Sequence, residues 1–172
     1  MRWFAVLLVA LFIAALTLGC EEGEEGGVAA PSSSSPAEKK VERIVQAAPG
    51  AVAEAEGVRI TLNEVADPWV SDNMFPRPAS GRRFVAFDVT IEQVGGSHLA
   101  SQFNFQLTDA EGFAYDPELF SGPEPDLRMI DLGKGQKTRG WVTFEVNEGT
   151  PLKLLKYDPE LFTTKDIEFQ WE

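Results

Sequence analysis

Apolar and polar residues alternate over much of the chain after residue 50, a period typical of strands that bury one face. The clearest case is 84–93, where apolar side chains at 85, 87, 89 and 91 alternate with mostly polar ones. Eight segments between turn residues carry strand patterns of this kind. They are 52–55, 58–65, 84–93, 103–107, 113–115, 141–146, 152–157 and 167–171. So many short strands within one stretch of chain predict two packed sheets.

Four stretches within this region also resemble a known family. They read RFVAFDVTI at 83–91, FQLTDAEG at 105–112, LGKG at 132–135 and GWVTFEV at 140–146. They resemble an immunoglobulin-like domain common in uncharacterised bacterial lipoproteins, which is similar in fold to a secreted mycobacterial immunoprotective antigen. The resemblance implies an all-β, immunoglobulin-like antiparallel β-sandwich of about seven to eight strands over residues 50–172. That family has no established catalytic residues, so the resemblance assigns none here.

The first twenty residues have the composition of an export signal. Arg2 precedes an apolar run of sixteen residues, 3–18, and Gly19 and Cys20 are followed by glutamates. The run is shorter than the roughly twenty residues that a membrane-spanning helix needs, which argues against an uncleaved signal anchor. The end of the segment, LTLGC, resembles the lipobox of bacterial lipoproteins, with Thr17 where leucine is usual. The resemblance implies that residues 1–19 are a signal peptide and that Cys20 carries the lipid.

The segment that follows predicts a tether and a short connecting element. Residues 20–36 are acidic and rich in serine and glycine, and such a composition buries too little surface to fold. A capping pattern at 35–38 and an apolar face up to Ala48 predict a short helix over 37–49, with further linker as the alternative. We therefore expect a lipid-anchored domain on the outer side of the cell membrane.

Composition excludes several classes of function. Without residues 1–19 the chain has 14 Lys and Arg against 27 Asp and Glu, a formal charge of −13, which disfavours binding to nucleic acid. One cysteine and one histidine rule out an internal disulfide and the usual zinc and copper ligand sets. His98 follows Gly95-Gly96-Ser97 in a predicted turn without a nucleophile elbow. We expect no metal, no cofactor and no catalytic residue, and the sequence does not indicate the oligomeric state.

The connection 66–82 is the best candidate for a binding surface. It is longer than most loops in a compact domain and contains residue types that dominate interfaces. The candidate residues are Trp69, Met74, Phe75, Arg77 and Arg82. The alternative is that Trp69 and Phe75 pack beneath the loop as a small satellite core.

These features predict a non-catalytic binding or protein-interaction module. The candidate partners are a cell-envelope protein or a small ligand, and the sequence does not identify which. The alternative is a carrier of a small molecule or ion, with a pocket near the 66–82 loop. A hydrolase would need a serine and an aspartate within reach of His98.

An exact repeat adds one structural expectation. The hexapeptide YDPELF occurs at 115–120 and again at 157–162. In the structural interpretation, each copy ends a strand, its aspartate caps a helical turn, and its leucine and phenylalanine fold back on the core. The alternative is a duplicated partner-binding motif. The strand count places both copies at the same end of the sandwich, with the 95–100 loop.

Inhibition of lipoprotein signal peptidase in intact cells tests the assignment of Cys20. We expect the unprocessed precursor to accumulate, because cleavage before Cys20 requires that enzyme. Mass spectrometry of the purified protein measures the result. An unchanged mass in the presence of the inhibitor would contradict lipid attachment at Cys20.

Overall fold

The described residues form β-strands for most of their length. The computed structural model describes residues 42–72, 76–159 and 165–172, all within the unit Glu38–Glu172. The strands are β1 (Ile44–Gln46), β2 (Ala51–Ala55), β3 (Val58–Trp69), β4 (Arg82–Gln93), β5 (Ser97–Ala100), β6 (Phe105–Asp109), β7 (Ala114–Tyr115), β8 (Ile130–Gly133), β9 (Lys137–Asn147), β10 (Leu152–Tyr157) and β11 (Ile167–Gln170). A single 3-10 turn in this part of the chain, η1 (Gln102–Asn104), connects β5 to β6.

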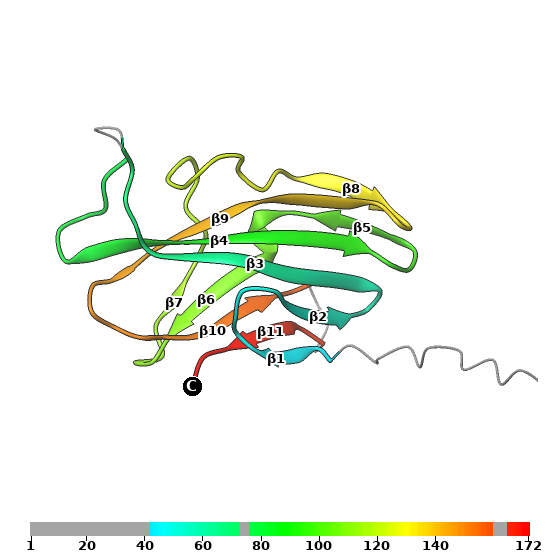
Figure 1. Cartoon of the computed structure of the whole chain (residues 1–172), viewed down its shortest axis with the longest axis horizontal. Helices are drawn as coiled ribbons and strands as arrows, with labels where there is room; N and C mark the ends of the chain where they lie inside the picture. The colour runs from blue at the N-terminus through cyan, green and yellow to red at the C-terminus, as the bar shows by residue number, and fades with distance from the viewer. Residues whose placement is uncertain (1–41, 73–75, 160–164) are drawn as a thin grey trace, which may run out of the picture. The chain divides into compact units, whose positions relative to one another are not determined.

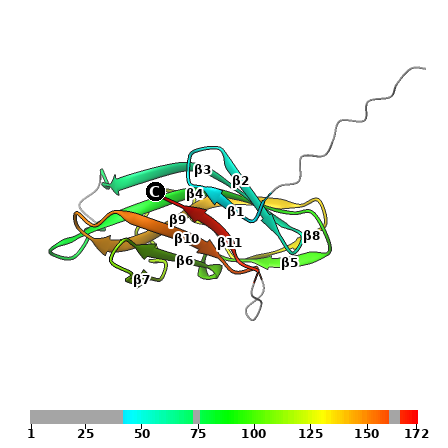
Figure 2. The ribbon, with the colours of Figure 1, turned by 90° about the horizontal axis from the view of Figure 1, so that it is seen from below.

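The strands form two main sheets that pack against each other (Figures 1 and 2). One sheet has the order β1-β11-β10-β6-β7 and the other β2-β3-β4-β9, while β5 and β8 pair as a two-stranded ribbon. Neighbouring strands are antiparallel except for β1 and β11, which are parallel. The predicted all-β sandwich is confirmed, with eleven strands in the described residues instead of seven or eight.

The core lies between the sheets and follows from the alternation in the sequence. Val85, Phe87, Val89 and Ile91 of β4 are fully buried, and the core continues with the aromatic ring of Phe144 on β9. The rings of Phe87 and Phe144 meet edge to face, with centroids 5.8 Å apart. Burying each such side chain contributes about 1.5–3 kcal/mol. The described residues contain no cysteine, so no disulfide among them adds to this stability, which depends on the hydrophobic core.

All eight predicted strands are present, and three further strands were not predicted. The expected helix over 37–49 is wrong for its described part, because residues 44–46 form β1. The amide of Ala47 donates to the carbonyl of Gln170 and the amide of Glu168 donates to that of Arg43, each at 2.8 Å. A short isolated helix is marginal in water, whereas this sheet edge satisfies the backbone directly. Residues 37–41 lie outside the described residues.

The predicted turn around His98 is also wrong, because residues 97–100 form β5 and pair with β8. The Nε2 atom of His98 shares a hydrogen bond with the hydroxyl of buried Tyr157, and the two rings meet edge to face. Phe103, expected to face the core with β6, lies in η1 and is 57% exposed. Residues 97–100 are therefore a strand because they pair with β8, which begins thirty residues further along the chain.

The pattern GWVTFEV at 140–146 has a structural explanation. The connection between β7 and β8 runs along β9 and bonds to it three times. The amide of Glu118 donates to the carbonyl of Thr143 at 2.7 Å. The amide of Leu127 donates to the carbonyl of Trp141, and the amide of Trp141 donates to that of Pro125, each at 2.9 Å. A Cβ atom on Gly140 would lie 2.6 Å from the backbone of Leu127. Only glycine allows the connection to approach this closely, and the connection covers the edge of β9.

The two copies of the hexapeptide have different surroundings. Both follow strands, β7 and β10, that run antiparallel to β6 toward its Phe105 end. The first copy then bridges to Thr143 within β9, and the second is described only to Pro159, so their placement at the same end of the sandwich stays a prediction. The predicted helical turn is wrong for the first copy, which bridges to β9 at Glu118 and leaves Phe120 82% exposed. The bond to Thr143 replaces the intrahelical bonds of a capped turn. Residues 160–162 of the second copy lie outside the described residues.

The predicted 105–115 hairpin is present and is organised by Asp109. This buried carboxylate accepts hydrogen bonds from the amides of Glu111 and Phe113 at 3.0 and 2.9 Å, and from the hydroxyl of Tyr115 at 2.6 Å. Burial alone would raise the pKa of Asp109, but these bonds and the amide of Gly112 outweigh it and lower the pKa. The ionised carboxylate therefore stabilises the folded state.

Replacement of Asp109 by asparagine tests this organising role. We expect Asp109→Asn to lower the free energy of unfolding by about 2–3 kcal/mol at pH 7, because an amide nitrogen would face an N–H or O–H donor. Urea titrations measure the difference, with the exposed Glu111→Gln as control. Since the folded-state pKa is depressed, the contribution is complete above the ordinary aspartate pKa, about 3.9, and disappears as the pH falls through the lower folded value. A difference that stays constant in acid would contradict this account.

Candidate functional site

Strands β3 and β4 extend beyond the part of the sheet that β2 covers. The pairing of β2 with β3 ends at Leu62, while β3 continues beside β4 until Trp69 lies opposite Phe84. Two register shifts interrupt this second half, between Leu62 and Glu64 and between Ala66 and Trp69. The extended pair carries the 66–82 connection to one end of the sandwich (Figure 1).

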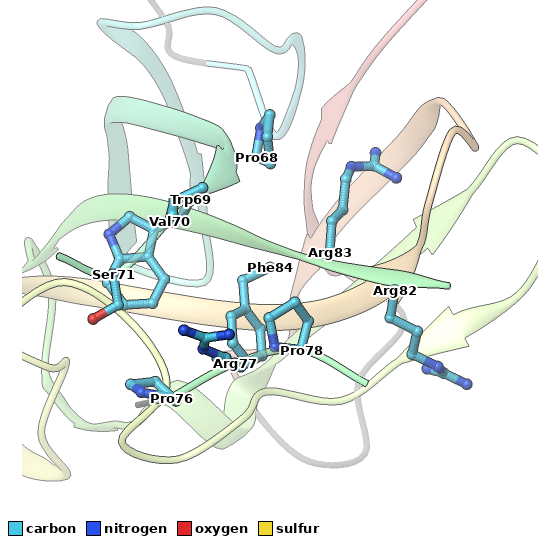
Figure 3. Close-up of a pocket in the computed structure, with 10 residues that line it drawn as sticks. All are labelled: Pro68, Trp69, Val70, Ser71, Pro76, Arg77, Pro78, Arg82, Arg83 and Phe84. Carbon is cyan, nitrogen blue, oxygen red and sulfur yellow. The ribbon is translucent and has the colours of Figure 1, made fainter. Parts of the chain in front are cut away.

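A partly open groove lies at this end, with a volume of about 400 Å³ (Figure 3). It is intermediate between an enclosed cavity and a flat surface. The lining combines aromatic rings, proline rings and arginines from β3, from the connection and from the start of β4. These residues are Pro68, Trp69, Val70, Ser71, Pro76, Arg77, Pro78, Arg82, Arg83 and Phe84.

Trp69 and Phe84 form the aromatic part of the groove. Their ring centroids are 6.1 Å apart at an interplanar angle of 48°, a tilted arrangement. Phe84 is only 4% exposed although it alternates with the core residues of β4 and faces the other side of the sheet. Trp69 is half-buried. The ring of Trp69 therefore covers the ring of Phe84, and the Trp69 ring itself remains accessible.

Hydrogen bonds to β9 hold the connection in place. The amide of Ala79 donates to Oε1 of Glu145 at 2.5 Å, and the amide of Arg82 donates to the carbonyl of Ala79 at 3.0 Å. The turn between them places Gly81 at φ +77°, which favours glycine. Nη1 of Arg82 donates to the carbonyl of Glu145 at 3.3 Å. The described part of the connection thus has a defined path along the strand.

Arg83 has a structural role behind the groove. Its Nε and Nη2 donate to the two carboxylate oxygens of Asp67 at 2.6 and 3.2 Å. Its Nη1 donates to the carbonyl of Asn147, and its Nη2 also donates to that of Thr150 at 2.8 Å. The hydrogen bond with Asp67 raises the pKa of Arg83 against the opposing effect of burial. Its charge is therefore largely committed to the fold.

The structure brings together three of the five residues proposed for the binding surface. Trp69, Arg77 and Arg82 line the same groove, while Met74 and Phe75 lie outside the described residues. The sequence reasoning missed Phe84 and Arg83. The alternation in β4 could have indicated Phe84, because it places an aromatic ring on the face opposite Val85. Cys20 also lies outside the described residues, and its lipidation stays a prediction.

A second, smaller hollow of about 230 Å³ lies beside His98 at the other end of β4. Exposed apolar side chains of Leu99, Phe103 and Met129 contribute to it. The lining residues include no arginine or lysine, and His98 itself bonds to Tyr157. The two hollows share no lining residue. The second hollow is therefore a suitable control surface.

Two absences hold for the described residues, 42–72, 76–159 and 165–172. No group of three or more His, Cys, Asp or Glu side chains there could hold a metal ion. No helix in the same ranges is both long and apolar enough to cross a membrane.

Comparison with known proteins identifies the domain but no activity. A family model described as a domain of unknown function (DUF4352) matches residues 48–167. No curated protein matches the sequence significantly. The family resemblance drawn from the sequence is therefore confirmed for the greater part of the folded region.

Solved structures of similar fold come from several bacteria. A putative lipoprotein of Bacillus subtilis, YcdA, has a TM-score of 0.57 at 14% identity and covers 72% of this chain, which spans only 38% of that protein's length. The YjhA protein of the same species has a TM-score of 0.52 at 20% identity, over 72% of this chain and 98% of that one. The secreted protein MPT63 of Mycobacterium tuberculosis has a TM-score of 0.46 at 18% identity, over 66% and 84%. The similarity to YcdA and YjhA supports the sandwich fold.

Alanine substitutions of the two stacked rings test how the groove is built. We expect Phe84→Ala to lower the free energy of unfolding by about 3–4 kcal/mol, because this ring is almost fully buried. Trp69→Ala should cost about half as much, since one face of the indole already contacts water. Urea denaturation measures both. An equal or larger loss for Trp69→Ala would assign its ring to a satellite core instead of the binding surface.

Proposed function

We propose that this chain, which belongs to the DUF4352 family, is a membrane-anchored extracytoplasmic lipoprotein that acts as a non-catalytic binding module. The groove between Trp69 and Arg82 is its binding site. The observation that carries the proposal is the half-buried ring of Trp69, which is supported from beneath by Phe84 and remains accessible. Rigid aromatic surface of this kind contributes strongly to binding.

The location follows from the N-terminal sequence. An apolar segment too short for a comfortable membrane span, followed by Gly19 and Cys20, favours export and lipid attachment. Two acyl chains would anchor the domain stably. The Bacillus subtilis protein YcdA, which has a similar fold, is itself described as a putative lipoprotein, in line with this location.

A non-catalytic role agrees with the chemistry of the groove. Among the described residues, its lining includes Ser71 but no histidine, aspartate or glutamate that could act as a base for that serine. The imidazole of His98 lies at the other end of β4 and shares its Nε2 with Tyr157. Burial and the charge of Asp158 raise the pKa of Tyr157, so its hydroxyl stays protonated in this bond. The side chains of His98 and Tyr157 therefore serve in packing and hydrogen bonding.

A carrier of small molecules is the second candidate. A volume of about 400 Å³ falls within the range typical of small-molecule pockets. The partial opening of the groove favours a larger ligand that is only partly enclosed, so we place protein interaction first. Native mass spectrometry of the protein purified from its own membrane separates the candidates, because a carrier would retain a bound small molecule.

Proximity labelling on intact cells tests the interaction module. A labelling enzyme fused to the C-terminus of the full chain should enrich a defined set of envelope proteins. We expect Trp69→Ala to abolish this enrichment while the protein stays folded and membrane-bound. Phe103→Ala is the matched control, since it removes an exposed aromatic ring of η1 that does not line the groove. Equal enrichment by the wild type and by Trp69→Ala would contradict a function at the groove.

A further inference from the structure

The charge of the groove is opposite to the charge of the whole chain. The chain has a formal net charge of −12, yet the charged residues among the described lining are Arg77, Arg82 and Arg83, without any aspartate or glutamate. Figure 3 shows Arg77 beside the ring of Phe84, while Arg82 and Arg83 extend in different directions from adjacent positions of β4. A groove lined in this way attracts negative charge although the molecule as a whole repels it.

The arginines have distinct roles in this arrangement. The charge of Arg83 is paired with Asp67, so it fixes the site without recruiting a ligand. Arg82 is exposed, and its hydrogen bond goes to the neutral carbonyl of Glu145, which does not neutralise the guanidinium. A guanidinium presents five N–H donors in a planar fork that matches a carboxylate. Arg82 is therefore the principal anion contact.

The remaining surface selects the shape of the ligand. Proline rings at 68, 76 and 78 and the rings of Trp69 and Phe84 form an apolar floor in a groove that is open on one side. Proline and aromatic side chains pack well on such surfaces, and extended proline-rich segments bind aromatic grooves at low entropic cost. An extended polypeptide can place an apolar ring on this floor and carboxylates at its mouth.

Addition of a strand to β3 is disfavoured. The edge of β3 beyond Leu62 is not paired by β2, but it carries two register shifts, and Pro68 has no N–H to donate. The exposed carboxylates of Glu64 and Asp67 lie along the same edge. Such features block pairing between strands. Recognition must therefore depend on side chains in the groove instead of backbone hydrogen bonds.

We infer that the groove binds an extended acidic segment of a partner protein, with an apolar ring on Trp69 and Phe84 and a carboxylate on Arg82. This inference rests on the proposed function and specifies its ligand. The site contains two arginines with different roles. Arg83 is paired with Asp67 and orders the fold, while Arg82 is exposed and contacts a carboxylate of the ligand. The apolar floor adds affinity, and the arginine adds the preference for acidic sequences.

Fluorescence anisotropy with labelled peptides tests the inference. The probe is a nine-residue peptide with a central Pro-Trp-Pro flanked on each side by three glutamates, and the full chain is used in detergent. Matched peptides replace all glutamates by glutamines or by lysines. We expect the glutamine peptide to bind about tenfold more weakly and the lysine peptide not to bind, because each carboxylate–guanidinium contact at a partly exposed site contributes up to about fivefold and the glutamine peptide lacks every carboxylate.

Two variants locate the charge preference. Arg82→Gln should weaken binding of the glutamate peptide about fivefold and leave the glutamine peptide unchanged, because only the former has a carboxylate for Arg82. Arg128→Gln is the matched control, since Arg128 is also exposed but does not line the groove. Circular dichroism and urea denaturation of both variants exclude a general loss of folding.

The possible results separate this inference from the proposed function. Equal binding of the glutamate and glutamine peptides, or no effect of Arg82→Gln, overturns the acidic preference, while sensitivity to Trp69→Ala would still support the groove as a binding site. Binding that survives Trp69→Ala overturns both. If the wild type binds none of the peptides but a chain with glutamines at 21, 22, 24 and 25 does, the chain's own acidic stretch occupies the groove, which overturns an external partner.

Discussion

The guanidinium of Arg83 connects three parts of the chain at the end of the sandwich where the groove lies. It bonds to Asp67 near the end of β3, to the carbonyl of Asn147 at the end of β9, and to that of Thr150 in the following turn. Charge-assisted bonds of this kind contribute about 1.5–3 kcal/mol each. Because strand residues alternate between faces, a fixed Arg83 also fixes its neighbours Arg82 and Phe84 on the other face.

The groove is therefore preorganised although it lies on the surface. Phe84 supports Trp69 from below, and Glu145 holds the connection through Ala79. A site that is already ordered loses little conformational entropy when it binds, so more of the contact energy remains as affinity. The sheet edges nearby offer few backbone partners, since the connection after β7 covers β9, and Pro68 interrupts β3. Backbone pairing at these edges is therefore limited, which agrees with the proposed recognition through side chains.

Local pattern was sufficient for the strands that form the core and insufficient for those at its edges. The alternation in β4 predicts its buried face directly, and β10 has the predicted bounds. β1 and β5 were missed because each is stabilised by a distant partner, β11 and β8 respectively. Trp69, Arg77 and Arg82 were chosen from the composition of a long connection. Phe84 was missed because it lies on the outer face of the sheet. Its burial there becomes evident only once the structure shows that Trp69 covers it.

The all-β class and the acidic charge can be read from the order of residues, because strand period and composition are local properties, and an export signal around Cys20 is predicted in the same way from hydrophobic length. The arrangement of the groove is different. Asp67 and Arg83 are sixteen residues apart, and the carbonyl that Arg82 contacts lies sixty-three residues away. Strand pairing alone brings these groups together, so the tertiary structure decides which arginine orders the fold and which one stays exposed in the groove.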